Sequence, residues 1–236
     1  MNSLEKILAD LTLHIYPEHV KPEFRPKIQM DKTKKARLEE YYTMLTGIRQ
    51  VHQKILRYET YFESFYSKDS GISDHEALKH HIHAYLQDLS RLKEKVEYFL
   101  GQLKNDVKKI AINKDEIGNA LATFRSNASK VFDLVSDRRN RHHHSGMDFA
   151  DGDILDVEIA ETFLDDKTKL KSLITPEAIK RFEKTKVEAF QKAKDKWKKT
   201  ASSNNVQING FVDEVFKTCK NLIHTYLKIK EFVNSN

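Results

Sequence analysis

The sequence predicts an all-α protein, a bundle of about five long helices that follows a short N-terminal helix and a proline-containing connector. Glycine and proline are scarce, with 7 and 4 occurrences among 236 residues, and charged residues make up 32%. This composition favours long helices over short strands joined by turns. Apolar residues recur at intervals of three and four along most of the chain, the spacing that places them on one helix face.

The N-terminal region predicts a helix and then an extended connector. Residues 3–16 have an amphipathic pattern, and Pro17, Pro22 and Pro26 follow it. Proline lacks a backbone N–H and clashes with the preceding turn, so this spacing forbids a continuous helix. We assign residues 1–30 to this helix and connector, and residues 31–236 to a single helical-bundle domain.

Capping signals predict where the long helices begin. The first helix extends from Thr33 to about residue 66. Ser73 and Glu76 form a capping box for a second helix that ends near residue 110, because a Ser hydroxyl and a Glu three residues later satisfy each other's backbone N–H groups. Asn113 and Glu116 repeat this pattern at the start of a third helix.

The C-terminal half predicts two further helices separated by polar segments. Residues 148–166 contain eight acidic side chains and no Lys or Arg, and we expect a solvated connector there. Thr175 and Pro176 supply an N-cap and a first-turn proline for a helix that ends near Lys199. The segment TASSNN, residues 200–205, is expected to be a loop before the last helix.

Charge and cysteine content limit the classes of function. Lys and Arg number 41 against 35 Asp and Glu, for a net charge of +6, which is compatible with a polyanionic partner such as RNA. Cys219 is the only cysteine, so an intramolecular disulfide is impossible and a reducing compartment is favoured. No apolar run approaches the roughly 18 residues of a membrane span. We therefore expect a cytoplasmic protein.

The segment SDRRNRHHHSG, residues 136–146, concentrates three arginines and three histidines within seven positions. The apolar stripe of the third helix ends at Val135 and continues in helical steps to Arg138 and His142. Arg and His therefore lie on the same face as the buried residues. This favours a polar site beside the core over a solvated helix end.

Arginine and histidine together suit the cleavage of RNA. Arginine is permanently charged and presents paired donors that match phosphate oxygens, and histidine exchanges protons near neutral pH. Attack by a 2′-hydroxyl on the adjacent phosphate needs proton transfer and stabilisation of charge on the phosphoryl oxygens. No metal is obligatory, because the RNA supplies its own nucleophile. We expect no metal and no cofactor.

Arg139, Asn140 and His144 resemble the signature of the HEPN superfamily, in which an Arg, commonly followed by a polar residue such as Asn, is separated from a His by four to six residues. Arg138 with His143 or His144 also satisfies this spacing. The resemblance implies an all-α HEPN-like fold and a metal-independent endoribonuclease of toxin–antitoxin, phage-defence or RNA-processing systems. It further implies an active site shared across a homodimer. Arg139 and His144 would be its catalytic pair, Asn140 would orient the site, and Arg138 and His143 would be the second choice of register.

Other charged groups allow weaker interpretations. The helix from Pro176 to Lys199 has nine Lys or Arg against four acids, which indicates either the solvated back of a core helix or a face that tracks RNA phosphates. The acidic segment could restrain the Arg/His cluster electrostatically, in which case neutralising Asp151 and Asp153 would raise activity. A second histidine group is expected at the surface. The predicted RNA contacts are Arg141, Lys192, Lys194, Lys198 and Lys199, and the second histidine group is His75, His80, His81 and His83.

These patterns predict a homodimeric, metal-independent endoribonuclease, with RNA and an antitoxin or regulatory protein as its expected partners. The alternative is a non-catalytic helical interaction, scaffold or RNA-binding module, in which the Arg/His cluster is a charged contact patch.

Overall fold

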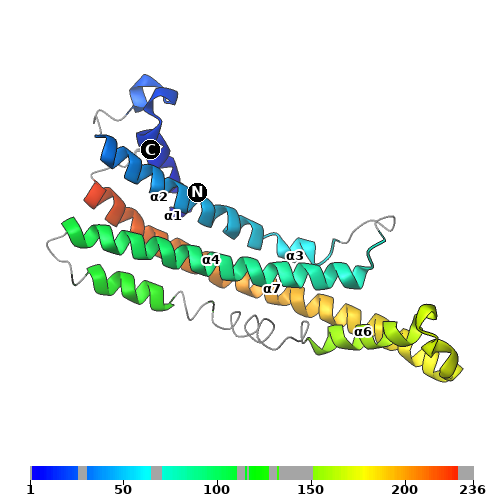
Figure 1. Ribbon diagram of the computed structural model, residues 1–236. Helices are drawn as coiled ribbons and strands as arrows, with labels where there is room; N and C mark the ends of the chain where they lie inside the picture. Colours follow the sequence, from blue (N-terminus) through cyan, green and yellow to red (C-terminus); the bar gives the residue numbers. More distant parts are fainter. Residues whose placement is uncertain are drawn as a thin grey trace. The chain divides into compact units, whose positions relative to one another are not determined.

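The computed structural model describes residues 2–25, 31–64, 71–110, 115, 117–127, 132 and 151–227, and all regular elements among them are helical (Figure 1). In chain order these are α1 (Ser3–Ile15), 3₁₀ turns at Pro17–His19 and Pro22–Phe24, α2 (Lys32–Ile55), α3 (Tyr58–Tyr61), α4 (Asp74–Ile110), α6 (Gly152–Leu164), 3₁₀ turns at Asp166–Thr168 and Leu170–Leu173, and α7 (Pro176–Leu227). Residues 117–127 are also helical. The predicted all-α class, with a short N-terminal helix before long helices, is confirmed.

The described residues divide into two compact units, each assembled from segments far apart in the sequence. The first unit takes its residues from Met1–Gln53, Leu89–Leu134 and Val206–Asn236, and the second from Lys54–Asp88 and Val135–Asn205. Helices α4 and α7 each contribute residues to both units.

In the first unit, α1 begins at a complete capping box. The Asn2 side chain accepts a hydrogen bond from the Glu5 amide at 2.9 Å, and the Glu5 carboxylate accepts one from the Asn2 amide at 3.3 Å. The Ser3 amide also donates to the Asp213 carboxylate of α7 at 2.8 Å, which ties α1 to α7. The buried apolar side chains of the unit include Leu4, Ile7, Leu11, Ile15, Leu38, Leu45, Leu92, Val96, Phe99, Val215, Phe216 and Cys219.

An aromatic cluster forms the core of the second unit. The Tyr58 and Tyr85 rings lie 5.1 Å apart, Phe62 meets Tyr85 edge-on at 5.8 Å, and Phe62 lies 6.4 Å from Trp197. All four side chains are at most 2% exposed. Edge-on and tilted ring pairs add to the burial of apolar area, so this cluster joins α3, α4 and α7 within the unit.

Two predicted helix starts are confirmed. The Ser73 hydroxyl accepts from the Glu76 amide at 3.2 Å, and the Glu76 carboxylate accepts from the Ser73 amide at 2.8 Å. At the start of α7, the Thr175 hydroxyl accepts from the Ala178 amide at 3.2 Å. Each pair satisfies an amide that the first turn of a helix leaves without a partner.

The prediction of one continuous helix from Thr33 to about residue 66 is wrong, because the helix is interrupted. Helix α2 ends at Ile55, and the chain turns before α3. At the turn the Arg57 amide donates to the Lys54 carbonyl and the Thr60 amide to the Arg57 carbonyl, at 3.1 and 3.0 Å. These tighter hydrogen bonds change the helix register and let Tyr58 enter the aromatic cluster.

The prediction of a loop at residues 200–205 is also wrong, because α7 runs through it without a break. Ala201 is fully buried and Asn205 is 9% exposed. The Thr200 hydroxyl donates to the Lys196 carbonyl at 2.8 Å, and the Asn204 amide donates to the Tyr85 hydroxyl at 3.0 Å. Packing and these bonds outweigh the modest helix propensities of Ser, Thr and Asn.

The acidic segment is not a solvated connector over its whole described length. Helix α6 occupies Gly152–Leu164 and buries Ile154, Val157 and Ala160 at intervals of three. That spacing was present in the sequence, but the surrounding carboxylates obscured it. Three of its carboxylates, Asp153, Glu158 and Glu161, form ion pairs with lysines of α4 and α7.

Candidate functional site

The Arg/His cluster of residues 138–144 lies outside the residues that the structure describes. This applies to all six of its predicted site residues, Arg138, Arg139, Asn140, Arg141, His143 and His144. The nearest described positions are Phe132 upstream and Asp151 downstream. Phe132 is 1% exposed and meets Phe211 edge-on at 5.9 Å in the first unit.

Asp151, seven residues after His144, is held by hydrogen bonds within the second unit. Its carboxylate accepts hydrogen bonds from the Asp153 amide at 3.0 Å, the Trp197 indole N–H at 3.0 Å and the Lys196 ammonium at 2.8 Å. Burial alone would raise the pKa of the Asp151 carboxyl, but these donors outweigh it and the pKa lies below its ordinary value. Asp151 is therefore an ionised anchor that starts α6 and joins it to α7.

Two of the four predicted RNA-binding lysines are paired with carboxylates. Lys192 lies 2.7 Å from Asp153, and Lys198 lies 2.6 Å from Glu63. These hydrogen bonds raise the pKa of both lysines. Both lysine side chains are exposed to solvent, so each can exchange its carboxylate for an RNA phosphate.

The four lysines also lie on both sides of the buried stripe of α7. Ala193 and Trp197 are buried, and at 100° per residue Lys192 and Lys199 fall on one flank of that stripe while Lys194 and Lys198 fall on the other. An RNA strand tracked along one flank would meet only one pair. Asp151 and Asp153 were predicted to restrain the Arg/His cluster electrostatically. In the structure Asp153 pairs with Lys192 and Asp151 with Lys196, so both carboxylates have partners on α7.

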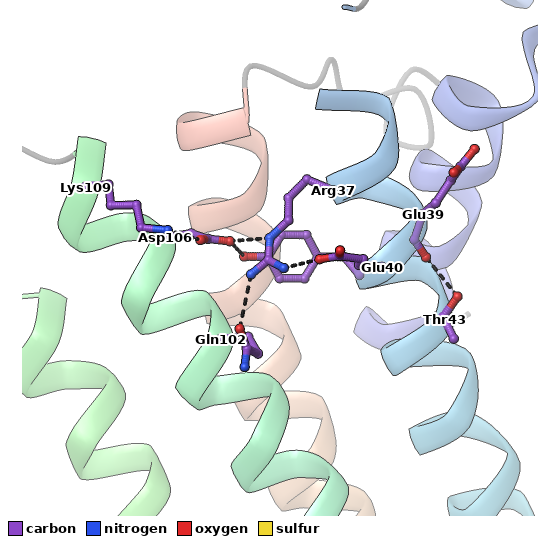
Figure 2. Close-up of polar contacts among 8 residues, drawn as sticks. Arg37, Glu39, Glu40, Thr43, Gln102, Asp106 and Lys109 are labelled. Atoms are coloured by element: carbon purple, nitrogen blue, oxygen red, sulfur yellow. Dashed lines mark hydrogen bonds and ion pairs between the residues drawn. The ribbon is translucent and has the colours of Figure 1, made fainter. Parts of the chain in front are cut away.

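A polar network that the sequence patterns did not reveal joins α2 to α4 in the first unit (Figure 2). The Arg37 guanidinium donates to the Asp106 carboxylate at 2.5 Å, and the Tyr41 hydroxyl donates to the same carboxylate at 2.7 Å. Arg37 also contacts Glu40, lies 3.4 Å from the Gln102 carbonyl oxygen, and stands 4.9 Å from the centre of the Tyr41 ring.

The acid–base properties of this network follow from its hydrogen bonds. Burial would raise the pKa of Asp106, but the donors Tyr41 and Arg37 hold it below its ordinary value. Burial and the bond to Asp106 raise the pKa of Tyr41. The network is an ion pair between Arg37 and Asp106, to which Tyr41 adds a hydrogen bond, and it holds α2 against α4. The spacing of residues along the sequence does not predict this network, because Arg37 and Asp106 are far apart in the chain.

Several histidines are buried, contrary to what their polarity suggests. His14 is 3% exposed, with its Nδ1 2.7 Å from the Asp10 carbonyl, and His224 lies 3.2 Å from the Asp10 carboxylate. In the second unit, His75 is 6% exposed and lies 3.1 Å from Glu161, so the surface location predicted for it is wrong. His224 joins α7 to α1 through Asp10, and His75 joins α4 to α6 through Glu161.

Within the described ranges, no group of three or more His, Cys, Asp or Glu side chains is arranged to hold a metal ion. None of the described helices combines the length and apolar character that crossing a membrane requires. The chain matches no family model, no curated protein and no solved structure.

Proposed function

We propose that this protein is a metal-independent endoribonuclease of the HEPN type, acting in a reducing cytoplasm in a toxin–antitoxin, phage-defence or RNA-processing role. The observation that carries the proposal is the Arg139-Asn140 pair followed by His144, at the predicted end of a helix in an all-α chain. The all-α fold supports it, because the resemblance implies that architecture.

The proposed chemistry assigns each residue a distinct role. Arg139 binds the scissile phosphate and stabilises the charge that develops on its oxygens. His144 transfers a proton to or from the reacting oxygens, and Asn140 orients the site. Arg138 and His143 provide the same two groups in the alternative register. The bond formed joins the 2′-oxygen to phosphorus, and the bond broken releases the 5′-oxygen, which takes up a proton.

A homodimer would complete this site. Cleavage needs one group that accepts the 2′-hydroxyl proton and another that protonates the leaving oxygen. Two-fold pairing brings two copies of the cluster together and supplies both. Sedimentation equilibrium tests this part, and a strictly monomeric active protein would contradict the shared site.

The direct test is cleavage of RNA by the purified protein in EDTA, with the product ends mapped. Wild type is expected to leave 2′,3′-cyclic phosphates. His144→Ala and Arg139→Ala are expected to lose about 10²- to 10⁴-fold in rate, the usual contribution of a positioned acid–base group. His19→Ala is the control, because His19 is an exposed histidine outside the cluster. Equal losses in all three variants would contradict the assigned roles.

A non-catalytic helical interaction module is the second candidate. The pairing of Lys192 with Asp153 and Lys198 with Glu63 favours it, because those lysines already have a structural role. Expression in cells separates the two functions. Growth arrest that Arg139→Ala relieves, with the fold intact, supports the nuclease. A cellular activity that survives Arg139→Ala but is lost in the core variant Phe216→Ala supports the module.

A further inference from the structure

A groove in the first unit combines free cations with an unexplained helical glycine. It has a volume of about 420 Å³ and is lined by α4 and the helical residues 117–127, which lie beside each other in Figure 1. Its lining includes the cations Lys104 and Arg125, the hydroxyl of Ser126, Gly101 and one carboxylate, Glu97.

Several basic side chains of the described ranges are already paired with a carboxylate. Lys192, Lys196 and Lys198 each contact a carboxylate within 2.8 Å. Lys104 and Arg125, by contrast, form no ion pair or hydrogen bond among the described residues. Their charges are therefore available to an anion that enters the groove.

Gly101 has no structural reason to be glycine. It lies inside α4, where glycine is the poorest helix former after proline. A Cβ built on it meets no atom within 4 Å, so close packing does not require its absence. Gly101 lines the groove, and the absence of a side chain leaves that floor open to a ligand.

An exposed aromatic side chain lies on the same helix, outside the residues that line the groove. Tyr98 is 61% exposed, and it precedes Gly101 by three residues on α4. Residues three apart are neighbours on a helix surface. Unpaired RNA bases stack on exposed aromatic rings of this kind, while their phosphates take up Lys and Arg.

We infer that this groove binds single-stranded RNA, with backbone phosphates on Lys104 and Arg125 and a base stacked on Tyr98. The inference rests on the proposed function and names where its substrate is held, upstream in sequence from the Arg/His cluster. The negative charge of Glu97 repels the phosphates and therefore limits the affinity of the groove for RNA. An acidic peptide would satisfy the two cations, but it offers no base for Tyr98.

The test is the binding of a fluorescein-labelled single-stranded oligouridylate to the full chain in EDTA, measured by anisotropy over a range of salt concentrations. All variants carry His144→Ala, so that RNA is not consumed. Replacing Lys104 and Arg125 by Gln should weaken binding and reduce the slope of log affinity against log salt by about 1.4, since each phosphate contact on a single strand contributes about 0.7. The matched control replaces Lys32 and Lys217, exposed cations outside the groove, and should leave the slope unchanged.

Four further variants test the aromatic ring, the open floor and the carboxylate of the groove separately. Tyr98→Leu should weaken binding about tenfold, while Tyr98→Phe should bind as wild type, because only the ring is needed. Gly101→Leu should weaken binding without changing the salt slope, and Glu97→Gln should strengthen it. Circular dichroism confirms that each variant is folded.

The outcomes distinguish the groove from the proposed nuclease. Cleavage by the chain with an intact His144, together with groove variants that bind like the control pair, overturns the groove alone. Binding through the groove without any cleavage supports the groove and contradicts the nuclease. Absence of both overturns both. Groove variants that lose affinity for a polyglutamate peptide but keep their affinity for RNA also overturn the inference.

Discussion

Replacing Asp151 by Ala should destabilise the second unit, because one buried carboxylate serves three donors. The Asp151 side chain is 3% exposed. Its loss leaves the first turn of α6 without a cap and the indole N–H of the buried Trp197 without its acceptor. It also removes the ion pair to Lys196.

The magnitude follows from these three losses. Loss of an N-cap costs about 1 kcal/mol, and a buried N–H left without an acceptor costs roughly 1–3 kcal/mol. The Lys196 side chain is 43% exposed, so its ion pair adds well under about 1 kcal/mol after solvent screening. The expected loss in the free energy of unfolding is about 2–4 kcal/mol.

Urea unfolding at neutral pH measures this loss. Asp166→Ala is the matched control, because its carboxylate is 85% exposed and pairs with Lys171 at the surface; we expect a change below about 1 kcal/mol. Asp151→Asn retains an acceptor oxygen and should lose less than Asp151→Ala. If Asp151→Ala is no less stable than Asp166→Ala, the anchoring role of Asp151 is refuted.

The pKa of Asp151 adds a pH signature to the same comparison. Its folded-state pKa is depressed, so its contribution to stability is complete above the unfolded pKa, near 4. That contribution is lost as the pH falls through the lower folded value. Wild type should therefore lose stability more steeply than Asp151→Asn below about pH 4. Equal slopes would mean that the carboxylate is not specifically stabilised in the folded protein.

Three further predictions rest on buried groups. Tyr41→Phe removes a 2.7 Å hydrogen bond to Asp106 and should lower the free energy of unfolding by about 1 kcal/mol in urea; no change would mean that this bond contributes nothing. Burial holds the pKa of His14 below its ordinary 6.5 despite the opposing effect of Asp10, so stability should fall as the pH drops below 6.5, and His14→Gln should flatten that part of the urea-midpoint profile. Cys219 is fully buried and its thiol pKa is raised by burial, so a thiol reagent such as DTNB should react with it only after unfolding; rapid reaction of the native protein would contradict its burial.

The predicted helix starts succeeded where the signal was local. The Ser73 and Thr175 hydroxyls accept hydrogen bonds from amides in the first turn of their helices, and the Glu76 carboxylate accepts one from the Ser73 amide. Pro176 has no N–H that would need a partner. Such a signal spans only a few residues, so it needs no knowledge of the rest of the fold. The stripe of Ile154, Val157 and Ala160 was equally local, but the charges around it suggested a connector.

The incorrect boundaries depended on distant partners. Asn204 remains helical while it donates to Tyr85, which lies far away in the sequence. Tyr58 enters a cluster with Tyr85, and this accompanies the turn after α2. Propensity at these positions is weak, and a tertiary contact worth about 1 kcal/mol decides between helix and loop.

The two candidate sites also differ in whether neighbouring residues or distant ones form them. The Arg139, Asn140 and His144 pattern is visible in the sequence because its residues are adjacent, and its role remains a prediction. The groove of Lys104 and Arg125 belongs to two helices and became visible only in the tertiary structure.

By itself, the sequence determined the all-α class, the caps that start the long helices and the chemistry concentrated at residues 138–144, because each depends on neighbours along the chain. Only the tertiary structure decided that α7 is continuous, that Asp151 anchors α6, and which carboxylates pair with the lysines of α7. Those outcomes depend on which side chains meet across helices, and the spacing of residues within one helix does not specify its partners.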